Sequence, residues 1–101
     1  MEIRAEELKK KLGEVFLLDV RQPWEHDTAR IAGDVLIPMN ELPARLAELP
    51  RDKTVVAYCH SGMRSLRVAQ FLRQQGFADA LSLAGGIDAW SLAVDPAVPR
   101  Y

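Results

Sequence analysis

Hydrophobic residues along the chain form short continuous runs, which alternate with stretches where apolar side chains recur at helical spacing. The runs Val15–Val20 and Thr54–Tyr58 predict two central strands, because apolar side chains on both faces suit a sheet covered on both sides. Shorter runs predict strands at Val35–Ile37 and Ala80–Leu83, with a further strand residue at Ile3.

The helical spacing predicts a helix after each of these strands. The first expected helix ends near Leu12, and three further helices are expected over 40–49, 65–75 and 87–92. Pro23 is expected to open a short helical turn. Pro43 is then placed in the first turn of its helix, where a missing N–H costs little. The alternation predicts an α/β fold, a three-layer sandwich with a mainly parallel sheet of about five short strands and helices on both faces.

Composition narrows the class of protein. The 101 residues fit a single domain spanning 1–101, and they carry a net charge of −1 with basic and acidic residues interleaved. We therefore expect no nucleic-acid partner, which would need a clustered basic face, and no membrane partner, because no apolar run approaches ~20 residues. A single cysteine forms no internal disulfide, and the N-terminal residues lack a basic start and an apolar core, so we expect a cytoplasmic protein. We also expect a monomer.

The strongest chemical signal is the only cysteine, Cys59, which ends an apolar strand and precedes a short loop and a helix. A free cysteine has a pKa of roughly 8.5. The helix dipole lowers such a value by about one unit, so a dominant thiolate needs further help. Successive N–H groups can curl into an anion-binding nest, Gly62 removes an obstructing Cβ, and Arg64 adds a permanent charge. The candidate site consists of Cys59 as nucleophile and an anion-binding loop of His60, Ser61, Gly62, Met63, Arg64 and Ser65.

Two supporting residues follow the other central strand. Asp19 and Arg21 reach the same sheet edge as Cys59 if the two strands are neighbours, since ligands of parallel sheets bind beyond the carboxyl ends of the strands. We interpret both as structural, pairing with loop amides or with Glu25. Trp24 is expected to pack in the core or against loops.

The chain resembles the single-domain rhodanese family, the thiosulfate sulfurtransferase homology domain. Nearly the whole chain takes part, through the segments Leu17–Arg21 with Glu25, Ile31–Gly33 with Ile37–Pro38, Cys59–Ser65, and Leu83–Trp90. One departure is Ala29-Arg30, where the family usually has Gly-His.

The resemblance implies a sulfurtransferase that works by ping-pong transfer. Cys59 would take the outer sulfur of a small anionic donor such as thiosulfate, hold it as a persulfide, and pass it to a thiophilic acceptor: cyanide in an assay, and a thiol or a protein in the cell. Neither a metal nor an organic cofactor is implied. The roles of His60 (tuning donor charge or lining the entrance) and the physiological partners stay open.

The same residues leave three alternative functions. Relatives with five residues between cysteine and arginine act as phosphatases, whereas four residues separate Cys59 from Arg64, which is the sulfurtransferase length. A non-catalytic module is disfavoured because such domains often lack the cysteine. A zinc site of Cys59, His60 and His26 has no recurrent ligand spacing, and His26 is expected on the surface.

Overall fold

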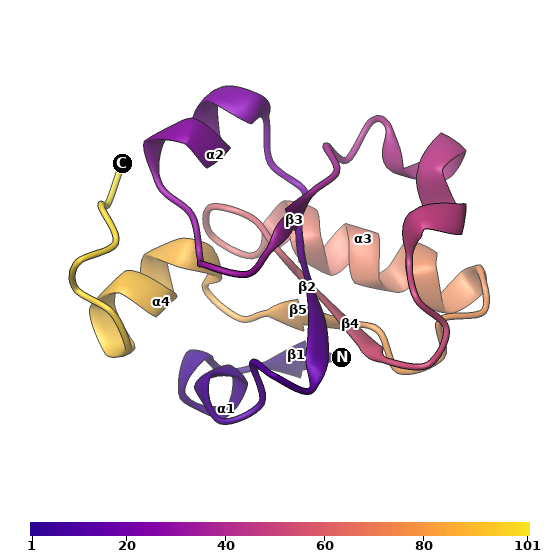
Figure 1. The fold of residues 1–101 in the computed structure, drawn as a ribbon, viewed down its shortest axis with the longest axis horizontal. Coiled ribbons are helices and arrows are strands. Elements are labelled where there is room, and N and C mark those ends of the chain that lie inside the picture. The colour runs from indigo at the N-terminus through magenta and orange to yellow at the C-terminus, as the bar shows by residue number, and fades with distance from the viewer.

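A computed structural model describes all residues, 1–101, as a five-stranded parallel sheet with helices on both faces (Figure 1). The strand order is β1-β5-β4-β2-β3. The strands are β1 (Glu2–Ile3), β2 (Val15–Asp19), β3 (Val35–Leu36), β4 (Thr54–Tyr58) and β5 (Leu81–Leu83). The helices are α1 (Ala5–Lys9), α2 (Pro23–Thr28), η1 (Leu42–Glu48), α3 (Met63–Gln74) and α4 (Gly86–Ala93). The predicted fold class is therefore confirmed.

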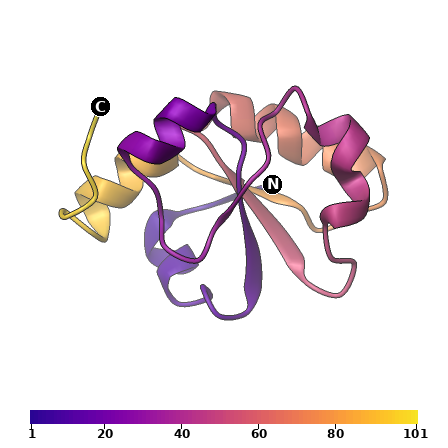
Figure 2. The same cartoon turned by 45° about the horizontal axis from the view of Figure 1, so that its top comes forward.

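Alternation along the two central strands builds a core on each face of the sheet. On β4, Val55 and Ala57 face α3 and η1, while Val56 and Tyr58 face the side of α1 and α4. Figure 2 shows α3 and α1 on opposite sides of the strands. The prediction of central strands buried on both faces is confirmed, and it explains why neither run alternates with polar residues.

The pairing of β2 with β4 brings the candidate site together. Asp19 lies opposite Tyr58 in this parallel register, and the N–H of Val20 donates to the Tyr58 carbonyl at 3.1 Å. Both strands end at the same edge of the sheet, so Cys59 and Arg21, which follow β4 and β2, lie near each other there. The expected common edge is confirmed.

The segment expected to be a helix over 40–49 is a broken 3-10 helix instead. Its backbone hydrogen bonds join residues three apart, as from the N–H of Ala44 to the Glu41 carbonyl. The helix is interrupted at Arg45, whose backbone has the non-helical angles φ −120° and ψ 18°. Pro43 supplies no N–H to the first turn, and the guanidinium of Arg45 is held between Glu41 and Glu48 at 2.7–3.1 Å. The α-helical prediction for this stretch is wrong, although its start near Pro43 is right.

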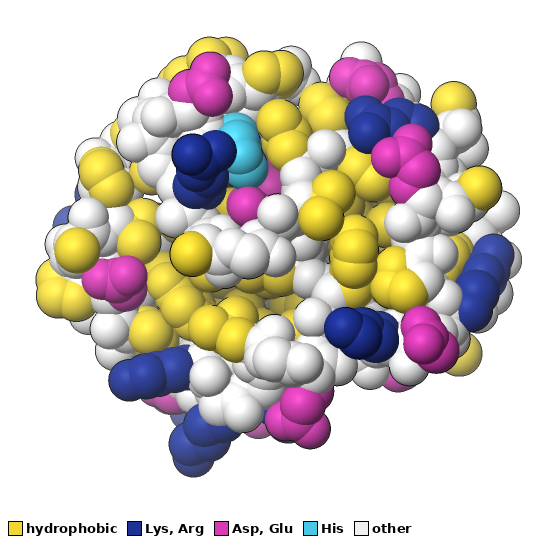
Figure 3. Space-filling model, in the orientation of Figure 1, with side chains coloured by type: hydrophobic (Ala, Val, Ile, Leu, Met, Phe, Trp, Pro, Cys, Tyr) yellow, Lys and Arg dark blue, Asp and Glu magenta, His cyan; other side chains and the backbone are white.

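Smaller differences concern element boundaries. The first helix ends at Lys9 and gives way to turns before Gly13, and α3 begins at Met63, two residues earlier than expected. No helix is both long and apolar enough to span a membrane. Basic and acidic side chains are dispersed among hydrophobic ones over the face seen in Figure 3.

Candidate active site

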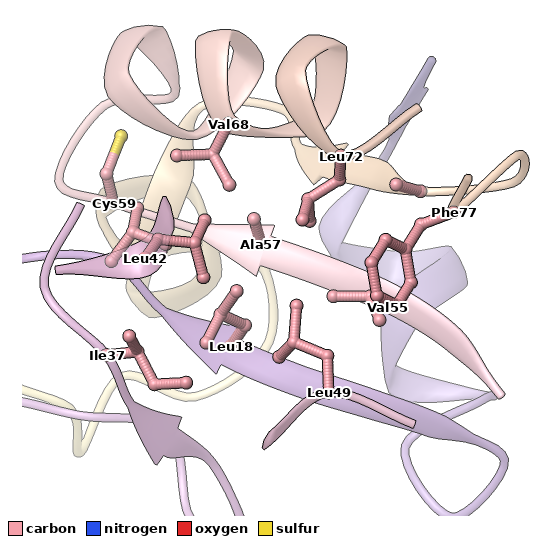
Figure 4. Packing of buried hydrophobic residues seen from close by; sticks show 12 residues of the cluster. Leu18, Ile37, Leu42, Leu49, Val55, Ala57, Cys59, Val68, Leu72 and Phe77 are labelled. Atoms are coloured by element: carbon pink, nitrogen blue, oxygen red, sulfur yellow. The ribbon is translucent and has the colours of Figure 1, made fainter. Parts of the chain in front are cut away.

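The sulfur of Cys59 lies inside the turn that joins β4 to α3. It accepts the N–H of Gly62 at 3.1 Å and the N–H of Ser65 at 3.4 Å, and the residue is only 1% exposed. Figure 4 shows the side chain at the end of the buried cluster, beyond Val68 and Leu42, with its sulfur directed toward the start of α3. Two amides that converge on one sulfur suit a negative charge there.

Two buried hydroxyl groups lie close to the sulfur, in addition to the two amides. The Ser65 hydroxyl lies 3.4 Å from Sγ of Cys59, 3.3 Å from the Gly62 carbonyl and 2.7 Å from the Ser82 hydroxyl of β5. Both serines are fully buried. The sequence indicated Ser65 as a loop residue but gave no sign of Ser82, which belongs to a strand pattern of small and apolar residues.

Glycines permit the loop to pack directly on the start of α4. Gly62 has φ +104°, and a Cβ there would lie 3.2 Å from the Gly85 nitrogen. The N–H of Ile87 donates to the Cys59 carbonyl at 2.9 Å, and the N–H of Asp88 donates to the His60 carbonyl at 3.2 Å. The first turn of α4 thus fixes the backbone of the cysteine loop, a role that the sequence did not reveal.

The guanidinium of Arg64 is paired with a carboxylate. Its Nη1 and Nη2 donate to the two oxygens of Glu25 at 2.8 and 2.9 Å. Glu25 also accepts the hydroxyl of Tyr101 at 2.7 Å and the N–H of Gln22 at 3.1 Å. Hydrogen bonds from Arg64 lower the pKa of Glu25 to about 2, and burial raises the pKa of Tyr101 to about 12, so the tyrosine keeps its donated proton. Binding of an anion by Arg64 stays a prediction, with Nε free of protein partners.

Asp19 and Arg21 form a fully buried ion pair with each other. Nε and Nη2 of Arg21 both donate to the Asp19 carboxylate at 2.8 Å. The same guanidinium binds the carbonyl of Ala29 at 2.6 Å, the carbonyl of Glu25 at 3.3 Å and the hydroxyl of Tyr101 at 2.8 Å. The expected pairing with Glu25 is present, but through the Glu25 backbone carbonyl, and the main partner of Arg21 is the Asp19 carboxylate. The pair ties α2 and its following loop to the sheet.

Aromatic and apolar side chains line the rim of the loop. The His60 ring lies 4.2 Å from the Tyr101 ring, and Trp24 meets Tyr101 edge-on with centroids 5.9 Å apart. Trp24 is 62% exposed and Met63 is 71% exposed, while Ser61 is exposed without a side-chain hydrogen bond. Trp24 therefore packs against the C-terminal segment and not in the core. Tyr101 is a site residue that the sequence did not indicate.

The zinc set considered from the sequence does not assemble. Metal-ligating types gather instead at Asp19, His26 and Asp34. Their atoms are already used, because Asp19 binds Arg21, and Tyr58 donates to Asp34 at 2.5 Å. His26 is mostly buried, against expectation: Arg30 donates to its Nε2 at 3.0 Å, so its Nδ1–H donates to Asp19 at 2.9 Å.

The buried Glu25 gives a pH-dependent prediction. Its pKa is lowered on folding, so its carboxylate stabilises the protein above pH 4.5 and loses that contribution as the pH falls toward 2. Glu25→Gln should lower the free energy of unfolding at pH 7 by about 1–3 kcal/mol, with a smaller deficit at acidic pH. Urea unfolding between pH 7 and pH 2.5 measures this. The exposed Glu41→Gln is the control, with a change under about 1 kcal/mol; an equal, pH-independent loss in both variants would contradict the assignment.

Comparison with known proteins gives the same architecture and sequence pattern. The family model of the rhodanese-like domain matches residues 4–93. A protein named sulfurtransferase from Allochromatium vinosum is 41% identical over 93 residues, covering 89% of this chain and 87% of that protein.

Two solved structures share the fold over nearly the full chain. A rhodanese-related protein from Thermoplasma volcanium superposes with a TM-score of 0.89 at 33% identity, covering 99% of this chain and 98% of the other. A human single-domain sulfurtransferase gives 0.83 at 28% identity, covering 91% and 96%. With a family model matched over most of its length and a relative of similar size above 40% identity, this chain belongs to the rhodanese-like domain family.

Proposed function

We propose that this protein is a sulfurtransferase that moves sulfane sulfur from thiosulfate or a persulfide donor to a thiophilic acceptor through a persulfide on Cys59. The observation that carries the proposal is the buried Cys59 sulfur, which faces the amides of Gly62 and Ser65. The similarity to a named sulfurtransferase of nearly equal length supports the same reaction class.

In the first half-reaction, the Cys59 thiolate attacks the outer sulfur of thiosulfate. A new S–S bond forms at Cys59, the S–S bond of thiosulfate breaks, and the electron pair leaves with sulfite. The loop amides stabilise the charged sulfur before and after transfer, since hydrogen bonds to charged groups are stronger than neutral ones. The free Nε–H of Arg64 is available to an approaching oxyanion.

In the second half-reaction, an acceptor attacks the outer sulfur of the persulfide. A bond forms between the acceptor and that sulfur, the S–S bond to Cys59 breaks, and the electron pair of that bond stays on Cys59 as the thiolate. Cyanide serves as acceptor in an assay and yields thiocyanate; a small thiol or a protein thiol serves in the cell. These steps call for neither a metal nor an organic cofactor. A reducing compartment such as the cytoplasm keeps the lone thiol free.

Intact-mass spectrometry after treatment with thiosulfate tests the proposal. We expect a gain of one sulfur atom on Cys59, removal of that sulfur by cyanide, and release of thiocyanate. The four-residue spacing to Arg64 argues against a phosphatase. A protein that gains no sulfur and hydrolyses an aryl phosphate efficiently would overturn the proposal.

A further inference from the structure

Ser82 of β5 is linked to the cysteine site through Ser65. Its side chain is fully buried, and its hydroxyl has a single partner, the Ser65 hydroxyl at 2.7 Å. Ser65 is in turn within 3.4 Å of the Cys59 sulfur. Ser82 of β5, Ser65 of α3 and the sulfur of Cys59, which follows β4, therefore form a short chain of contacts.

The direction of the bond between the serines follows from counting protons. If Ser65 donated to Ser82, the Ser82 proton would be buried with no acceptor, because no other partner lies within hydrogen-bond distance. Leaving a buried donor unsatisfied costs about 1–3 kcal/mol. Ser82 is therefore the donor, and Ser65 is the acceptor.

This direction leaves the Ser65 proton with two destinations, the Gly62 carbonyl at 3.3 Å and the Cys59 sulfur at 3.4 Å. The Gly62 carbonyl already accepts the N–H of Leu66 at 3.1 Å, so it does not depend on Ser65. While the sulfur is protonated, its S–H can donate to Ser65, whose own proton faces Gly62. Once the sulfur is charged, it is the stronger acceptor, and rotation of one hydroxyl brings the Ser65 proton to it.

We propose that Ser82 is a positioning residue that, by donating to Ser65, directs the Ser65 hydroxyl onto the Cys59 thiolate. The inference rests on the proposed function only in taking Cys59 as the reacting thiolate. Without Ser82, the Ser65 oxygen loses its fixed donor, and its proton is no longer oriented by the strand behind it.

The test is the pH profile of alkylation of Cys59 by iodoacetamide, which follows the thiolate without requiring sulfur transfer. Ser82→Ala should move the midpoint of this profile upward by roughly half to one pH unit. Ser65→Ala should move it in the same direction, and adding Ser82→Ala to that variant should produce no further shift. Ser82→Thr, which keeps the hydroxyl, should restore the wild-type midpoint.

Ser91→Ala is the matched control, because Ser91 is also a buried serine, but its hydroxyl donates to the Ile87 carbonyl within α4. It should leave the alkylation midpoint unchanged. Circular dichroism and urea unfolding establish that each variant folds; Ser82→Ala removes one oxygen and leaves the backbone pairing of β5 in place. An unchanged midpoint in Ser82→Ala, or a full additional shift in the Ser65→Ala background, would overturn the proposal. Failure of the sulfur-transfer assay alone would contradict the proposed function and leave this profile intact.

Discussion

Replacing Cys59 with serine is expected to abolish thiocyanate formation from thiosulfate and cyanide while the protein remains folded. A serine hydroxyl is not ionised near neutral pH and forms no persulfide, so the first half-reaction has no nucleophile. Removing a nucleophile in this way should lower turnover by roughly 10³-fold or more. The hydroxyl still accepts the Gly62 N–H, so the free energy of unfolding should change by about 1 kcal/mol or less.

Steady-state thiocyanate formation and urea unfolding, measured on the same preparation, check this result. Ser91→Ala provides a variant with a comparable small change in a buried side chain whose hydrogen bond lies within α4 and not at the sulfur. Turnover by Cys59→Ser within tenfold of wild type would end the persulfide mechanism. An unfolded variant would instead show that the sulfur contributes more to packing than its contacts indicate.

Gly86→Ala should produce the largest structural effect of any Gly→Ala substitution in this chain. Gly86 has φ +62°, which costs alanine roughly 1–2 kcal/mol. The new Cβ would also lie 2.5 Å from the Cys59 carbonyl oxygen and against the His60 carbonyl, so either α4 or the cysteine loop must move. We expect a loss of about 2–4 kcal/mol in the free energy of unfolding, together with a large loss of sulfur transfer.

Gly33→Ala separates the two causes. Gly33 also has a positive φ, +87°, but a Cβ there meets nothing within 4 Å. This variant should lose only the conformational part, roughly 1–2 kcal/mol, and keep its activity. Equal losses of stability in the two variants, or full activity in Gly86→Ala, would show that contact between α4 and the cysteine loop is unimportant.

Much of the fold could be predicted because its signals are local. Val15–Val20 and Thr54–Tyr58 are apolar on both faces, and only central strands of a covered sheet require this. The segment around Pro43 could not be assigned correctly, since its leucines repeat at helical spacing whether the backbone is α-helical or 3-10. The break at Arg45 depends on the backbone and on two carboxylates that the spacing of leucines does not report.

The candidate site also has one part that the sequence predicts and one part that it does not. The cysteine loop is contiguous, so a strand, a glycine and an arginine in order were enough to predict it. The partners that complete it come from elsewhere: Glu25 meets Arg64 across 39 residues, and Tyr101 meets Glu25 across 76. Glu25 could be singled out from the sequence, because it belongs to a segment that carries the family resemblance. Its pairing with Arg64 was not predicted. Nothing in the local pattern around Tyr101 distinguishes it from a surface residue.

The order of the strands has a consequence for the biosynthesis of the protein. β1 is made early, yet its only partner is β5, through Glu2–Ser82 and Ile3–Leu83. The amides that hold the Cys59 and His60 carbonyls come later still, from Ile87 and Asp88. Cys59 is therefore synthesised before the residues of α4 whose amides orient its loop. The surroundings of the Cys59 thiol are complete only after α4 has been synthesised.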